Sequence, residues 1–285
     1  MSASDNSFTP TGWISGYVKN TLEQDGSIYI SPGIPVGTTI LSLTILPIHI
    51  YSNDPHPEPF PGLTVNFAAF GREFLIRADP YDPRDSIQFF EWQVTYGTAP
   101  SDYTPIRWVS GATKSADIPQ LVEVNAPSGI ALNGLTVLPI HVYDNDPNPE
   151  PWPALDVDFT DSGNFWLYSR SGGEGPRDSI NWFLWQGVLG PTSTKPSIRK
   201  WTSGYTKNAQ LPMLIAPSIP EGKGIVSVDV FPIHVYDNDP KPEWWPALRV
   251  TFPTPQTFEI KEGEGEKPRD KINWFLWQVA YSDLS

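Results

Sequence analysis

The stretch of residues 47–58 reads P-I-H-I-Y-S-N-D-P-H-P-E, and nearly the same residues return at 139–150 as P-I-H-V-Y-D-N-D-P-N-P-E and at 232–243 as P-I-H-V-Y-D-N-D-P-K-P-E. The step between copies is 92 and then 93 residues. Solenoid repeats are about 20 to 50 residues long, whereas this period is the length of a small domain. The sequence therefore predicts three homologous domains in one chain.

Other landmarks keep the same step. Three short motifs recur in each copy. The Trp-x-Ser-Gly segment begins at Trp13, Trp108 and Trp201, the arginine of Pro-Arg-Asp is residue 84, 177 and 269, and the tryptophan of Trp-Gln is residue 92, 185 and 277. We expect domains at residues 1–100, 101–193 and 194–285. The links between them are too short to hold the domains far apart.

Short strands are predicted in each copy. They are rich in β-branched and aromatic residues and are bounded by turn residues. The chain's 32 prolines and 22 glycines argue against long helices, because proline inside a helix costs about 3 kcal/mol. In the third copy we expect strands at 201–207, 211–215, 225–236, 249–252, 257–261 and 271–281. The predicted fold class is all-β, with three tandem six-stranded antiparallel β-sandwich domains.

Polar and apolar residues alternate in the strand expected at 225–236. Ser227 and Asp229 fall on one face, and Val228 and Val230 fall on the other. We expect one buried face and one that is not buried. Three such domains can close a ring around a pseudo-threefold axis, as in a cyclic trimer, or can stack in a line. The ring is the arrangement we expect.

Charge and composition disfavour several kinds of partner. The net charge is −13, and both nucleic acids and anionic membrane surfaces attract basic proteins. No apolar run approaches the roughly 20 residues of a membrane-spanning helix, so no membrane insertion is expected. There is no cysteine, hence no disulfide and no thiolate metal site. Residues 1–11 lack a basic region followed by an apolar core, so we expect no cleaved secretory signal.

The order of elements in each copy resembles the H-type lectin domain. In the third copy the resemblance rests on Ser203-Gly204, the proline-bearing turn at 214–220, the strand at 225–230, Leu248-Arg249-Val250, Thr257-Phe258 and Ile272-Asn273-Trp274. It covers nearly all of each repeat as a pattern of short matches. The resemblance implies six-stranded sandwiches that assemble as trimers and bind galactose or N-acetylgalactosamine between subunits. This chain would then be a covalent pseudo-trimer.

The chain departs from that family at the sugar site. The family's sugar-contacting arginine is matched only by Arg249, since the first two copies have Thr64 and Asp156 there. A loop that supplies a Gly and an Asp to the sugar is shortened. The family's aromatic-His pair is replaced by Glu- and Gly-rich turns such as 172–175 and 263–266. A chain can share the fold of a family without sharing its sugar-binding site.

The repeated N-D-P-x-P-E loop combines carboxylates and aromatic residues on a proline frame, and this combination is typical of sugar sites. A carboxylate accepts hydrogen bonds from adjacent hydroxyls, and an aromatic face covers the apolar side of the ring. The candidate ligand-binding residues are Asp54, Glu58 and Phe60, then Asp144, Asp146, Glu150 and Trp152, then Asp237, Asp239, Glu243, Trp244 and Trp245. Turn chemistry alone also explains the Asn, Asp and Pro, although not the Glu.

Two further sets of residues recur. The Pro-Arg-Asp motif adds ligand-binding candidates just before the last strand, namely Arg84, Asp85, Arg177, Asp178, Arg269 and Asp270. Its arginines suit hydroxyls and carboxylates alike, but they could equally form ion pairs with the loop carboxylates. His49, His141 and His234 lie between apolar strand residues. They either converge on a metal or are separate, partly buried histidines.

The leading functional prediction is a multivalent carbohydrate-binding lectin that recognises Gal/GalNAc-type glycans in agglutination or defence. Multivalency would raise avidity by about 10² to 10⁴. A structural protein of a virion or appendage is the alternative. A glycosidase is third, because nothing fixes a carboxylate pair at the roughly 5 to 9 Å required, so we expect no enzyme. We expect no cofactor, with calcium left open, and a chain that is cytoplasmic or released without a classical signal and acts on extracellular glycans.

Overall fold

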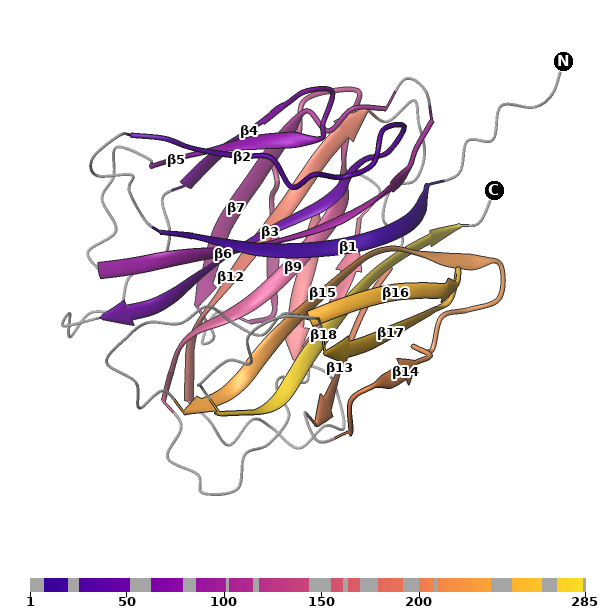
Figure 1. The fold of residues 1–285 in the computed structure, drawn as a ribbon. Coiled ribbons are helices and arrows are strands. Elements are labelled where there is room, and N and C mark those ends of the chain that lie inside the picture. Colours follow the sequence, from indigo (N-terminus) through magenta and orange to yellow (C-terminus); the bar gives the residue numbers. More distant parts are fainter. Residues whose placement is uncertain are drawn as a thin grey trace, which may run out of the picture.

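The structure is a computed structural model, and its described part is all-β (Figure 1). It describes residues 8–19, 26–51, 63–78, 86–100, 103–114, 118–143, 155–160, 164–169, 179–191, 200–207, 210–236, 248–262 and 271–283. No helix within these ranges is long and apolar enough to cross a membrane.

Within the described residues each copy contributes six strands, as predicted. The first contains β1 (Thr9–Lys19), β2 (Ile28–Ile30), β3 (Thr39–Tyr51), β4 (Leu63–Ala68), β5 (Glu73–Ala78) and β6 (Ser86–Thr98). The second contains β7 (Arg107–Lys114), β8 (Gln120–Val122), β9 (Ile130–Tyr143), β10 (Leu155–Phe159), β11 (Phe165–Ser169) and β12 (Ser179–Pro191). The third contains β13 (Lys200–Lys207), β14 (Met213–Ile215), β15 (Lys223–Tyr236), β16 (Leu248–Thr254), β17 (Thr257–Glu262) and β18 (Lys271–Asp283).

The strands of each copy form two three-stranded antiparallel sheets. In the first copy the orders are β1-β6-β3 and β2-β5-β4, and the other two copies repeat this topology. We call the sheet with the long strands the inner sheet and the sheet with the short strands the outer sheet. Ile45 and Val94 of one inner sheet pack with Phe74 of the facing outer sheet, and all three are fully buried. The two sheets therefore enclose one core, which confirms the β-sandwich prediction.

The prediction for the polar face of residues 225–236 is wrong. Ser227 and Asp229 are each only 1% exposed, although Val228 and Val230 fill the core on the opposite face. The polar face is buried because it packs against the other two copies. Asp229 accepts hydrogen bonds from Thr44 at 2.8 Å and from Thr136 at 2.6 Å. These threonines occupy the matching position in the other two copies, so one residue from each inner sheet meets in a shared network.

A glutamine of each central strand reaches the next copy. Gln93 accepts from the backbone N–H of Val230 at 3.0 Å and donates to the carbonyl of the same residue at 2.6 Å. Gln186 does the same with Ile45, at 2.8 and 2.7 Å. Gln278 does the same with Val137. Each receiving strand is an edge of its inner sheet, so the amide satisfies backbone groups that the sheet leaves unpaired.

Tryptophans also cross between copies. Trp108 of the second copy lies in the core of the first and donates its indole N–H to the carbonyl of Leu43 at 3.2 Å. Trp201 enters the core of the second copy, and Trp13 enters the core of the third. The pairs β7 with β4, β13 with β10 and β1 with β16 are in contact. In all these contacts the second copy reaches the first, the third reaches the second and the first reaches the third.

Candidate functional site

Most of the ligand-binding candidates lie outside the described residues. These are Asp54, Glu58, Phe60, Arg84, Asp85, Asp144, Asp146, Glu150, Trp152, Arg177, Asp178, Asp237, Asp239, Glu243, Trp244, Trp245, Arg269 and Asp270. Arg249 is described and is exposed on β16, opposite Lys261 of β17. His49, His141 and His234 belong to β3, β9 and β15, but their side chains are outside the description. Among the described residues, no group of three or more His, Cys, Asp or Glu could hold a metal ion.

A different set of chemically active residues meets on the outer sheet of the second copy. In β10, Leu155 and Val157 are buried, so the alternation of the strand turns Asp156 and Asp158 outward. In β11, Phe165 and Leu167 are fully buried in the same core, so Trp166 and Tyr168 turn outward. One face of this sheet therefore presents two carboxylates and two aromatic rings.

Strand register brings these side chains together. Asp158 lies directly opposite Trp166, and Asp156 lies directly opposite Tyr168. Tyr168 donates its phenolic hydrogen diagonally across the two strands to Asp158 Oδ2 at 2.5 Å. The side chain of Trp166 is left 42% exposed, which is unusual for a residue that prefers burial.

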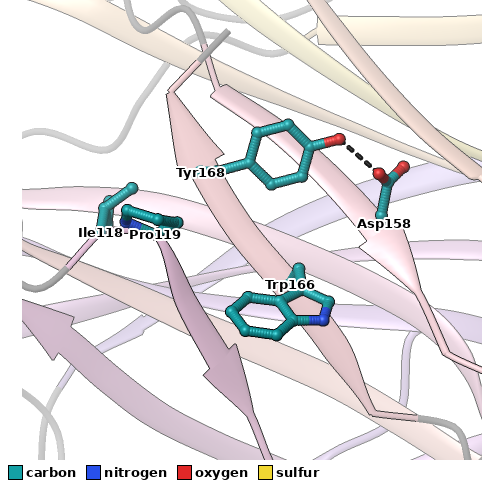
Figure 2. Close-up of a pocket in the computed structure, with 5 residues that line it drawn as sticks. All are labelled: Ile118, Pro119, Asp158, Trp166 and Tyr168. Atoms are coloured by element: carbon teal, nitrogen blue, oxygen red, sulfur yellow. Dashed lines mark hydrogen bonds between the residues drawn. The ribbon is translucent and has the colours of Figure 1, made fainter.

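Asp158, Trp166 and Tyr168 line a cavity of about 510 Å³, within the usual range for small-ligand sites. Ile118 and Pro119, which directly precede β8, form its remaining wall. β8 pairs with β11 through Gln120 opposite Leu167, which places this wall beside the aromatic strand. Figure 2 shows the space between Ile118 and Pro119 on one side and Asp158 on the other, with Trp166 and Tyr168 both projecting from β11. The cavity thus has an apolar wall, an indole and a polar edge.

The electrostatics of the polar edge are acidic. The hydrogen bond to Asp158, burial, and the charges of Asp158 and Asp156 together raise the pKa of Tyr168 to about 12. The phenol therefore keeps its proton at neutral pH and donates it in the hydrogen bond to Asp158. A ligand meets carboxylate and phenolic oxygens that can accept hydrogen bonds.

The other two copies have different residues on this face. The matching positions are Thr64, Asn66, Leu75 and Arg77 in the first copy and Arg249, Thr251, Glu259 and Lys261 in the third. In the third copy Lys261 forms an ion pair with Glu259 at 2.6 Å, and Thr251 donates to the same carboxylate at 3.3 Å. The hydrogen bond from Lys261 is the largest cause that lowers the pKa of Glu259. At these four positions only the second copy combines aromatic rings with carboxylates. Elsewhere on the outer sheet of the first copy, Tyr29 of β2 donates a hydrogen bond to Glu73 of β5.

Sequence reasoning missed this site although a signal was present. Residues 165–168 read Phe-Trp-Leu-Tyr, which is apolar or aromatic at every position. A strand with one buried face can bury only alternate residues, so two of these four residues, at least one of them aromatic, had to face outward. The short acidic alternation at 156–158, on a strand paired with them, would have completed the prediction.

A scan against protein-family models gave no match, and a search of curated proteins gave none either. The resemblance to H-type lectins therefore remains a prediction.

Proposed function

We propose that this protein is a carbohydrate-binding lectin and that the outer sheet of its second copy forms one binding site. The observation that carries the proposal is the half-exposed indole of Trp166 beside the hydrogen-bonded pair of Tyr168 and Asp158 in one cavity. Sugar rings have an apolar C–H side that stacks on an indole. Their hydroxyls bond to carboxylates.

The proposed sugar class is the Gal/GalNAc type that the H-type lectin resemblance implies, and the biological role is agglutination or defence. The cavity adds a site outside the repeated loops, which remain further candidates for binding. Because the three copies differ on their outer faces, this particular site occurs once per chain among the described sheets. Multivalency would come from the loops.

A glycan-array screen of the full chain, with and without chelator, tests the proposal first. We expect a coherent set of terminal sugars to bind, and the hits are then titrated by tryptophan fluorescence. Trp166→Ala should weaken binding at this site at least tenfold, because the stacking surface is lost. Leu214→Ala is the control, since Leu214 is an exposed apolar residue on the outer sheet of the third copy.

A folded chain that binds nothing on the array would overturn the lectin proposal in favour of an assembly protein. One observation favours that second function. Val36 and Phe70 are 89% and 85% exposed, and apolar side chains this exposed are often covered by a protein partner.

A further inference from the structure

The acidic edge of the cavity points to a more specific ligand. We infer that the site of the second copy selects amino sugars with a free ammonium group over matched neutral sugars, and that it excludes acidic sugars. This inference rests on the proposed carbohydrate-binding function and deepens it. Three features of the described residues support it: the hydrogen-bonding groups, the charge and the aromatic surface.

The hydrogen-bonding groups of the cavity are mainly acceptors. The phenolic hydrogen of Tyr168 is already donated to Asp158, and a carboxylate only accepts. The side chains of Ile118 and Pro119 offer no polar atom, so the indole N–H of Trp166 is the only other side-chain donor among the five lining residues. An ammonium group donates up to three hydrogen bonds and has no lone pair that would need a donor from the protein. A carboxylate-bearing sugar brings acceptors to a site that already has them.

The charge of the site points the same way. None of the five lining residues is cationic. Asp158 lies in the cavity, and the charges of both Asp158 and Asp156 act on Tyr168. On the matching face of the third copy Lys261 pairs with Glu259, and in the first copy Arg77 takes the position of Tyr168. The second copy thus lacks, at these positions, the cation that its neighbours have.

The aromatic surface suits a cation as well as a sugar ring. A cation above an aromatic face, within about 6 Å of the ring centre, is attracted by the ring quadrupole, most strongly by tryptophan. The ring of Trp166 lies on the same strand as Tyr168 and opposite Asp158. An ammonium group on the sugar can therefore contact the carboxylate while the C–H side of the sugar covers the indole.

The test compares sugars that differ in one group. The full chain is titrated with methyl galactoside, methyl galactosaminide, its N-acetyl form and methyl galacturonide at pH 6, where the free amine is protonated. Calorimetry and tryptophan fluorescence report binding. We expect the free amine to bind about 5 to 30 times more tightly than the galactoside and the N-acetyl form, and the galacturonide to bind weakest. High salt should reduce the advantage of the amine, because salt screens exposed charges.

Two variants isolate the carboxylate. Asp158→Asn should remove most of the advantage of the amine over the galactoside while the fold persists. Glu259→Gln, on the matching face of the third copy, should change neither affinity. Equal affinities for amine and neutral sugars, with both lost in Trp166→Ala, would overturn the inference and leave the lectin proposal standing. Failure of all four sugars and of the glycan array would overturn both.

Discussion

At the scale of single residues, two of the repeated sequence landmarks explain each other. The glycine of each Trp-x-Ser-Gly segment pairs across the sheet with the tryptophan of the same copy's Trp-Gln. A Cβ at Gly16, Gly111 or Gly204 would lie between 2.1 and 2.3 Å from the indole of that tryptophan. These motifs recur together because the indole occupies the space that a side chain at the glycine would fill.

Gly204→Ala should therefore destabilise the third copy. Its Cβ would overlap the ring of Trp277, which packs on the buried Phe258. Overpacking of this kind costs about 1 to 3 kcal/mol. The midpoint of urea unfolding measures the effect. Gly26→Ala is the comparison, because its Cβ would meet nothing within 4 Å and only its positive φ of 67° opposes the change. A smaller loss in Gly204→Ala than in Gly26→Ala would contradict the explanation.

At the scale of strands, the edge of each inner sheet is completed by a side chain from another copy. The amide of a central-strand glutamine takes the place of a neighbouring strand by pairing with one backbone N–H and one carbonyl. This arrangement uses the polar face of a strand as an interface. It also explains why glutamine, which has both a donor and an acceptor, recurs after the tryptophan in all three copies.

Gln186→Leu tests this role. The substitution leaves the backbone N–H and carbonyl of Ile45 buried without their partner, and each unsatisfied group costs about 1 to 3 kcal/mol. We expect a clear fall in the urea midpoint. Gln256→Leu should cost less, because that amide bonds only to carbonyls of a surface turn at 3.1 and 3.4 Å. Equal losses would mean that the contact between copies adds little stability.

At the scale of the whole molecule, the three copies meet around shared layers of side chains, and those layers are not symmetric. One apolar layer contains Leu138, Leu184, Phe231 and Leu276, with Leu46 packed on it. Glu91 occupies the position that is leucine in the other two copies, as its pairing with Leu46 shows. It is buried, and Gln93 donates to its Oε1 at 3.2 Å, while its Oε2 has no hydrogen-bond partner.

This buried acid should make stability depend on pH. Burial raises the pKa of Glu91 from 4.5 to about 8, and burial also raises the pKa of Asp229 from 3.8 to about 6. The folded state therefore binds protons more tightly than the unfolded state. This proton binding stabilises the fold completely when the pH is below the pKa values of the unfolded state. The stabilisation is lost as the pH rises toward the pKa values of the folded state. Glu91 contributes this loss between about pH 4.5 and 8, and Asp229 between about pH 4 and 6.

Glu91→Leu removes the pH dependence of stability that Glu91 causes, which extends to the highest pH of the two carboxyl groups. The variant restores the residue found in the other two copies, so it should be more stable than the parent by an amount that grows from pH 5 to pH 8, reaching a few kcal/mol. Thermal melting at a series of pH values measures the difference. Asp158→Asn serves as control, since that carboxylate lies in the surface cavity and not between the copies. A stability difference that does not change between pH 5 and pH 8 would show that Glu91 does not titrate there.

The chain's local patterns were sufficient for its all-β class and most of its strands, because β-branched runs and turn residues are properties of neighbouring residues. The same local patterns did not predict that Ser227 and Asp229 are buried. Alternation shows that two faces differ, but whether water or another domain covers the polar one depends on partners about 93 and 185 residues away, Thr136 and Thr44. The cavity of Asp158, Trp166 and Tyr168 likewise exists because register aligns β10 with β11 and β8 brings Pro119 beside them. Such a site depends on long-range pairing, and only the folded chain brings its members together.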